Sequence, residues 1–233
     1  MSIASYVESL YRAHTEEFLT SPAFQRLAMG EASVEEYDTF IANVYRTHQN
    51  SPQFLSFIYA VASPSAYERV AHNVLEEMGE EDEGESHPEL LLALLEGAGM
   101  GTRIDELQTA AREVMREVVC QPFMFGSLRE VGLSAMAEVF SFEHMLAHSS
   151  KEIAGALREH RGLDDEALIW FSHHSEVDIQ HAEEALLTIQ EYVDYYEFDE
   201  DEARDIIDLA MRENVFIKRY FSTAALAEAR DMT

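Results

Sequence analysis

The stretch DEALIWFSHHSEVDIQHAEEALLTIQEYVDYY, residues 165–196, decides the fold, because it predicts one long helix that carries chemically useful side chains. Apolar residues recur in it at spacings of three and four, which is the period of an α-helix. Within it, His174, Asp178 and His181 stand at i, i+4 and i+7, so on a helix they share one face. Two imidazoles and a carboxylate suit divalent iron, manganese or zinc. This face therefore predicts part of a metal site, with a solvated polar face as the alternative.

The helical period continues outward through nearly the whole chain, and strand-like alternation is scarce. With 233 residues, 47% of them apolar, the chain can form one sizeable core. We therefore expect a single all-α domain over residues 1–233, built from about seven or eight helices with short connections. The expected helices cover residues 3–19, 33–62 with a kink or split at Pro52, 64–77, 88–95, 103–119, 128–148 with a continuation after a bend at 151–160, 165–196 and 200–227.

The charge balance excludes several classes of partner. Acidic residues number 45 and basic residues 16, which gives a formal charge of −29. A nucleic-acid groove needs a basic face, and an anionic membrane surface would repel this chain, so we expect no nucleic acid and no membrane as partner. The longest apolar run, near Leu90–Leu95, is too short to span a bilayer. The first residues also lack the pattern of a secretion signal, so the expected location is the cytoplasm.

Other segments supply further ligand candidates. In NVLEEMGEEDEGESHPELLL, residues 73–92, a glutamate ends one expected helix and His87 begins the next, so the two can converge across a loop. Either Glu76 or Glu77 could fill the first role. Glu143 lies among apolar residues, where a carboxylate is costly unless it is paired or bound to a metal. Glu138 is its rival on the same expected helix.

These candidates add up to three carboxylates and three histidines, which is typical of a site for two iron ions. A ferritin-like bundle needs two separate helices with the Glu-x-x-His spacing. Here only Asp178 and His181 have that kind of spacing. The sequence therefore disfavours a ferritin-like bundle.

The chain resembles the heme-oxygenase-like diiron oxidases and oxygenases, relatives of the TenA and pyrroloquinoline-quinone synthase proteins. The matching motifs are N-x-L-x-E at 73–77, SHPEL at 86–90, F-x-F-E at 140–143 and H-x-x-x-D-x-x-H at 174–181. The resemblance favours Glu77 over Glu76, since Glu77 lies four residues after the asparagine. It implies a compact heme-oxygenase-like bundle of about seven helices, often dimeric, so we expect a homodimer. The implied metal ligands are Glu77, His87, Glu143, His174, Asp178 and His181.

The same resemblance implies an enzyme that binds two Fe(II) ions, with manganese as an alternative, and uses O₂ as co-substrate. The substrate would be a small molecule of amino-acid, amine or fatty-acid type, and the reaction N-oxygenation, desaturation or C–C cleavage. Tyr45 and His48 are candidate donors to the metal ligands. The candidate pocket aromatics are Phe24, Phe40, Tyr45, Phe123, Phe125 and Phe140.

Two other functions remain open at this point. A metal-free, TenA-like thiaminase or hydrolase would use Cys120, the only cysteine, as its nucleophile. That residue stands in VVCQPF among apolar neighbours, so we expect a small buried side chain instead. The third possibility is a non-catalytic module whose acidic surface binds a basic partner.

Overall fold

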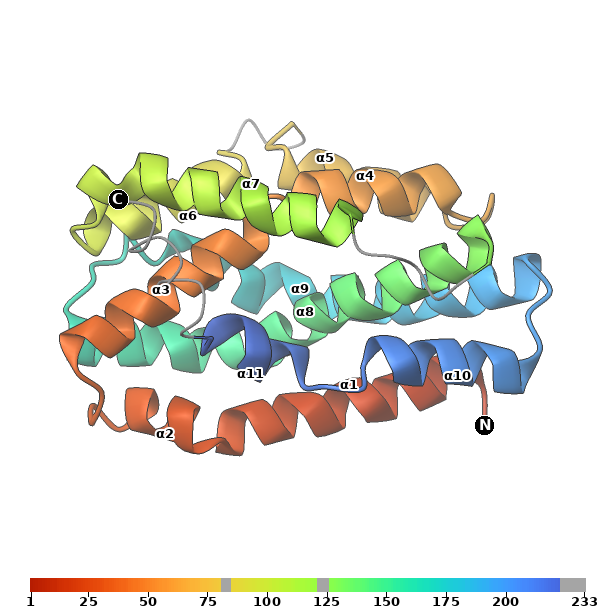
Figure 1. The fold of residues 1–233 in the computed structure, drawn as a ribbon, viewed down its shortest axis with the longest axis horizontal. Coiled ribbons are helices and arrows are strands. Elements are labelled where there is room, and N and C mark those ends of the chain that lie inside the picture. Colours follow the sequence, from red (N-terminus) through yellow and green to blue (C-terminus); the bar gives the residue numbers. More distant parts are fainter. Residues whose placement is uncertain (81–84, 121–125, 223–233) are drawn as a thin grey trace.

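The computed structural model describes residues 1–80, 85–120 and 126–222, apart from the side chains of residues 117–118 and 176–180. Every regular element in this part of the chain is a helix, so the prediction of an all-α fold is confirmed. Two long helices, α8 (Leu128–Ala156) and α9 (Ile169–Tyr195), pack along each other at the centre of the molecule (Figure 1). The other α-helices are α1 (Ile3–Thr20), α2 (Pro22–Ala28), α3 (Val34–His48), α4 (Ser51–Val61), α5 (Tyr67–Glu77), α6 (His87–Gly97), α7 (Ile104–Cys120), α10 (Glu200–Ala210) and α11 (Val215–Tyr220).

The outer helices cover the central pair on several sides (Figure 1). Helix α1 packs on both α8 and α9, α10 and α4 pack on α8, and α6 packs on α9. Helix α3 packs on α6, α7 and α11, and α4 packs on α5. The ligand-bearing segments expected on α5, α6, α8 and α9 thus belong to neighbouring parts of one bundle. No helix in the described part of the chain is both long and apolar enough to cross a membrane.

The structure divides the chain more finely than the expected seven or eight helices. The predicted split near Pro52 is present, since α3 ends at His48 and α4 begins at Ser51. The region 200–227, expected as one helix, contains two helices up to residue 222. They separate because the side chain of Asn214 accepts a hydrogen bond from the backbone of Ile217 and so starts α11 anew. The predicted capping box of Ser33 and Glu36 at the start of α3 is confirmed.

Helix α8 is longer than predicted. The bend expected between residues 148 and 151 is absent, and the helix runs unbroken to Ala156. A π-helical turn, residues 157–161, follows it and ends at Gly162, whose φ of 77° is a left-handed conformation that glycine adopts without strain.

A glycine allows the central helices to approach each other. A Cβ atom built on Gly132 of α8 would lie 2.1 Å from the hydroxyl oxygen of Tyr192 on α9. That hydroxyl donates a hydrogen bond to the carbonyl of Arg129, at 2.9 Å. The missing side chain therefore makes room for a contact that fixes α9 against α8, and α9 carries the histidines of the expected site.

Candidate metal centre

Three buried side chains form a first cluster, which we call the inner cluster: Glu77, His87 and His174. Glu77 is the last residue of α5, His87 the first of α6, and His174 lies in the second turn of α9. One potential ligand atom from each lies within 4.8 Å of the others. His174 donates a hydrogen bond from Nδ1 to the carbonyl of Trp170, at 2.7 Å. This bond orients the ring and leaves Nε2 as the metal-binding nitrogen.

Charge compensation holds the inner cluster together. Nδ1 of His87 lies 2.8 Å from Oε1 of Glu77, and the hydroxyl of Ser51 donates to Oε2 of Glu77. Burial acts to raise the pKa of Glu77, but the charge and hydrogen bond of His87 and the bond from Ser51 outweigh it, so this pKa lies below its usual value. Nε2 of His87 is buried without a hydrogen-bond partner in the described structure. Once the ring is neutral, a buried and unpaired nitrogen of this kind fits a metal ligand.

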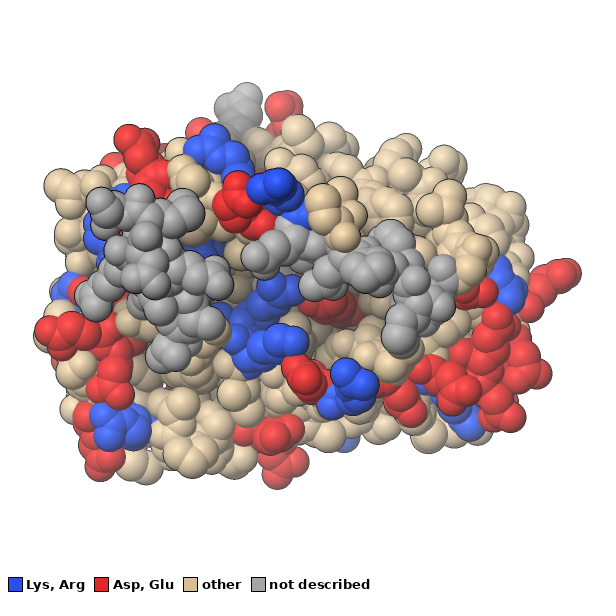
Figure 2. All heavy atoms as spheres, in the orientation of Figure 1, with Lys and Arg blue, Asp and Glu red and all other residues tan. Residues whose placement is uncertain are grey.

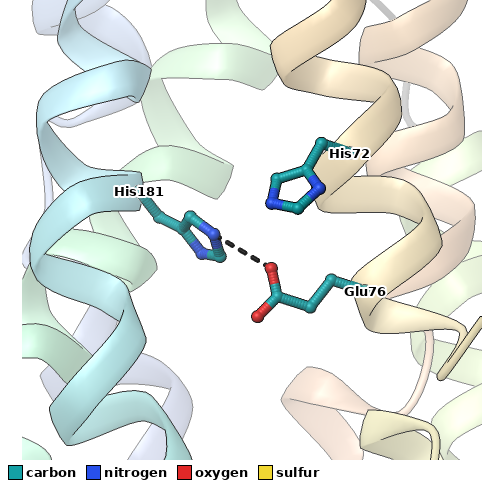
Figure 3. Close-up of side chains that lie close together, drawn as sticks. All are labelled: His72, Glu76 and His181. Atoms are coloured by element: carbon teal, nitrogen blue, oxygen red, sulfur yellow. Dashed lines mark ion pairs between the residues drawn. The ribbon is translucent and has the colours of Figure 1, made fainter. Parts of the chain in front are cut away.

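A second group, the outer cluster, consists of His72, Glu76 and His181, whose potential ligand atoms also lie within 4.8 Å of one another. His72 and Glu76 face His181 across the space between α5 and α9 (Figure 3). Nε2 of His181 is 3.0 Å from Oε2 of Glu76, and Nε2 of His173 is 3.4 Å from Oε1. His181 is buried, Glu76 half-buried and His72 exposed. The outer cluster is thus the more accessible of the two.

The pKa of Glu143, on α8, is affected by charged residues of both clusters. Burial raises its pKa to about 7, and this rise is opposed mainly by the charge of His181 and reinforced by Glu77 and Glu76. Its Oε1 accepts a hydrogen bond from Nδ2 of Asn73, at 2.8 Å. Its Oε2 is buried without a hydrogen-bond partner in the described structure. A carboxylate with one oxygen held and the other unpaired is suited to bind a metal ion.

The rival acidic residue on α8 has a different role. Glu138 pairs with Arg219 of α11 at 3.2 Å, with its side chain 40% exposed. It therefore belongs to the surface, and Glu143 is the glutamate that α8 brings to the two clusters.

The structure brings most of the predicted ligands together, but it divides them between two clusters. Glu77, His87 and His174 meet in the inner cluster, and His181 lies in the outer one. The backbone of Asp178 lies in α9 between these histidines, while its side chain is among those outside the described structure.

Sequence reasoning missed His72 and treated two adjacent glutamates as alternatives. Successive helical residues point about 100° apart, so Glu76 and Glu77 can each serve a different cluster. The signal that could have found both residues is the i, i+4 spacing of His72 and Glu76, which places them on one face of α5.

His48 and Tyr45, the two candidate donors to the metal ligands, have different surroundings. Nε2 of His48 is 2.6 Å from the hydroxyl of Tyr220, and its ring contacts Trp170 with centroids 5.0 Å apart. Burial lowers the pKa of His48 to about 3. The hydroxyl of Tyr45 is buried without a hydrogen-bond partner in the described structure, and burial raises its pKa. His48 thus reaches the site through Trp170, whereas no described contact links the Tyr45 hydroxyl to either cluster.

The aromatic residues expected to line a substrate pocket do not all lie at one cavity. Phe140 lines a cavity together with Glu143 and His181, whereas Phe24 and Phe40 line a second, apolar cavity. Phe123 and Phe125 lie outside the described residues.

The expectation for Cys120 was wrong, because this cysteine is exposed at the end of α7. Val119, its neighbour in α7, is exposed as well. In the described structure no hydrogen bond, ion pair or ring contact links Cys120 to either cluster.

The donor set fits iron on chemical grounds. It combines imidazole nitrogens with carboxylate oxygens, which divalent iron and manganese both accept. Two of its buried atoms, Nε2 of His87 and Oε2 of Glu143, have no hydrogen-bond partner in the described structure. Buried polar atoms are otherwise almost always paired, so these two fit atoms that bind a metal.

Comparison with known proteins agrees with this chemistry. Residues 38–213 match the model of a haem-oxygenase-like family described as iron-containing redox enzymes. The match covers well over half of the chain and includes both clusters and Glu143. No curated protein matched the chain. With its all-α fold and its histidine and glutamate clusters, the chain belongs to this family of iron-containing redox enzymes.

Proposed function

We propose that this protein is a non-heme diiron enzyme that uses O₂ to oxidise a small metabolite. The observation that carries the proposal is the pair of clusters, each with at least one histidine and one glutamate. Both draw residues from α5 and α9, and the inner one adds His87 from α6. Glu143 experiences the charges of both, which suits a carboxylate shared by two metal ions. Two neighbouring ferrous ions would supply electrons in pairs for the reduction of O₂.

In this proposal each residue has a defined task. Glu77, His87 and His174 hold one ion, and His181 and Glu76 hold the other, with His72 and Asp178 as further ligands. Ser51 and Asn73 donate hydrogen bonds to the carboxylates of Glu77 and Glu143 and so orient them. His173 lies beside Glu76, with 3.4 Å between its Nε2 and Oε1 of the carboxylate. The burial of the inner cluster keeps bulk water away from its ligands.

The first test is anaerobic titration with Fe(II), followed by metal analysis. We expect about two iron ions per chain. His174→Ala should reduce the content by about one ion through the inner cluster, and His181→Ala should do so through the outer one. His148→Ala is the matched control, because His148 is an exposed histidine of α8 outside both clusters. A parallel titration with Mn(II) distinguishes the two metals.

The second test adds O₂ to the loaded protein and follows its consumption together with the visible spectrum. We expect consumption by the wild type and the His148→Ala control, and a strong loss in both cluster variants. Absence of iron uptake by the wild type would contradict the proposal. The clusters would then be polar helix faces without a metal.

A further inference from the structure

Aromatic rings form a continuous path from the inner cluster to Tyr220. The ring of His174 lies against that of Trp170, with centroids 4.2 Å apart. The centroid of Trp170 is in turn 5.0 Å from that of His48, whose Nε2 lies 2.6 Å from the hydroxyl oxygen of Tyr220. Rings at such distances are in contact, and all four side chains are buried. An electron can therefore pass between a metal ion at His174 and Tyr220 without crossing water.

The hydroxyl of Tyr220 has a base beside it. Burial lowers the pKa of His48 to about 3, so this imidazole is neutral and its Nε2 can accept the hydrogen bond of the phenol. Loss of one electron makes a phenol a far stronger acid than an imidazolium ion, so the proton then moves along this bond to Nε2. The hydrogen bond thus makes Tyr220 easier to oxidise than a tyrosine without a base.

Two other oxidisable side chains near the inner cluster and Glu143 have no such base. Nε1 of Trp170 is buried without a hydrogen-bond partner in the described structure, so an oxidised indole keeps its proton and can take an electron from Tyr220. Tyr11 lies near the candidate metal centre, since burial and the charge of Glu143 raise its pKa. Its hydroxyl donates to the carbonyl of Ala137, at 2.8 Å, and a carbonyl does not take up a proton. We therefore expect oxidation to end on Tyr220.

The surroundings of Tyr220 protect an oxidised ring. Phe18, Phe40 and Phe142 lie around it, with ring centroids 5.8, 5.4 and 6.1 Å away. These phenylalanine rings are harder to oxidise than a phenol and exclude water. The backbone carbonyl of Tyr220 accepts a hydrogen bond from Nδ2 of Asn43, at 3.0 Å, which fixes the end of α11 against α3.

We propose that Tyr220 is a redox-active residue that gives one electron to the oxidised metal centre through Trp170. In this step the O–H bond of Tyr220 breaks, its proton goes to Nε2 of His48, and its electron reduces the iron. The products on the protein are a neutral phenoxyl radical and an imidazolium ion. The oxidant is the iron centre after its reaction with O₂, so this step rests on the proposed function. The path from Trp170 to Tyr220 does not, because it needs no metal.

The first experiment is laser flash photolysis of the metal-free protein. Trp170 is the only tryptophan of the chain, so light at the long-wavelength edge of the protein absorption ionises this residue alone. We expect the absorbance of the Trp170 radical to decay while that of a tyrosyl radical appears. Tyr220→Phe should abolish this conversion and prolong the life of the Trp170 radical.

Tyr11→Phe is the matched control, because it removes a buried hydroxyl near Glu143 and leaves Tyr220 and His48 in place. It should show the conversion of the wild type. His48→Gln keeps a side chain that can form hydrogen bonds but removes the base, so it should slow the conversion. Circular dichroism and thermal melting check that each variant is folded. Equal decay in the wild type and Tyr220→Phe, or an equal loss in Tyr11→Phe, would overturn the proposal.

The second experiment adds O₂ to the iron-loaded protein and freezes it for electron paramagnetic resonance. We expect a tyrosyl radical in the wild type, with a spectrum that narrows when the tyrosine rings are deuterated, and none in Tyr220→Phe. A wild type that consumes O₂ without forming this radical would overturn the electron transfer to iron.

Iron uptake separates this inference from the proposed function. Conversion after the laser flash in a protein that takes up no iron would support the path from Trp170 to Tyr220 and refute the diiron proposal. Iron uptake and O₂ consumption without that conversion would overturn only the path.

Discussion

His72 is the most exposed of the candidate ligands whose side chains the structure describes, and it distinguishes the two clusters at the scale of single residues. All three side chains of the inner cluster are buried, whereas the outer cluster has an exposed histidine and a half-buried glutamate. Water and competing ions therefore reach the outer cluster more easily. If the proposed two ions bind, we infer that the outer cluster holds its ion less tightly than the inner cluster does.

The corresponding prediction concerns His72→Ala. We expect this change to weaken binding of one metal ion about tenfold, or by about 1.4 kcal/mol, and to leave the other unchanged. Stepwise titration with Mn(II), followed by electron paramagnetic resonance of the free ion, measures both affinities.

Glu68→Ala is the control for His72→Ala, because Glu68 is exposed on α5 one helical turn away. Equal weakening of both metal sites by His72→Ala, or an effect of the same size in Glu68→Ala, would contradict the prediction.

Part of this arrangement could be predicted from single residues and their spacing. The positions of His174, Asp178 and His181 indicated one metal-binding face on α9, because helical geometry alone fixes such a face. The partition into two clusters could not be predicted, since it depends on how α5 is rotated relative to α9. That rotation, together with the position of α6, decides that Glu77 points to His87 and Glu76 to His181.

At the scale of helices, the close contact of α8 and α9 depends on Gly132. A methyl group there would overlap the hydroxyl of Tyr192 and approach its ring carbon Cζ to 2.9 Å. Gly132→Ala should therefore lower the free energy of unfolding by about 1–3 kcal/mol, as overpacked cores do. Urea unfolding followed by circular dichroism measures the loss.

Gly155→Ala is the matched control for this change, because Gly155 lies in the same helix and a Cβ there meets nothing within 4 Å. It should leave stability unchanged or raise it by up to about 1 kcal/mol, since alanine is the better helix former. The double variant Gly132→Ala/Tyr192→Phe should recover part of the loss. If Gly132→Ala is as stable as Gly155→Ala, then the Tyr192 contact does not set the helix spacing.

Helix boundaries were predictable only where a local signal marks them. The capping box of Ser33 and Glu36 marked the start of α3, because its hydrogen bonds involve neighbouring residues. The end of α10 was missed, since Asn214 offers only a single capping residue inside an otherwise helical pattern. The unbroken course of α8 was missed as well. Ser149 and Ser150, which lie at the expected bend, are both buried in the core and pack as part of the helix.

At the scale of the whole molecule, repulsion between negative charges destabilises the folded state. The chain carries a formal charge of −29. Figure 2 shows acidic side chains over much of one face, gathered densely at the end where α10 lies. Inside the bundle, the carboxylates of Glu77 and Glu76 repel that of Glu143. Such repulsion can be relieved in two ways, by salt that screens the surface or by cations bound at the centre.

These two effects can be separated by thermal melting. A metal ion that binds only the folded chain stabilises it by about 2.7 kcal/mol at a hundredfold excess over its dissociation constant, which for a chain of this size is a rise in Tm of about 5–10 °C. We expect Mn(II) to produce this rise in the wild type and not in His174→Ala/His181→Ala, because that double variant lacks one histidine in each cluster. Sodium chloride should raise the Tm of both proteins alike, since screening acts on the whole surface. An equal response of both proteins to Mn(II) would mean that the cation acts on the surface charge, and that the two clusters do not join α5, α6 and α9 through a metal.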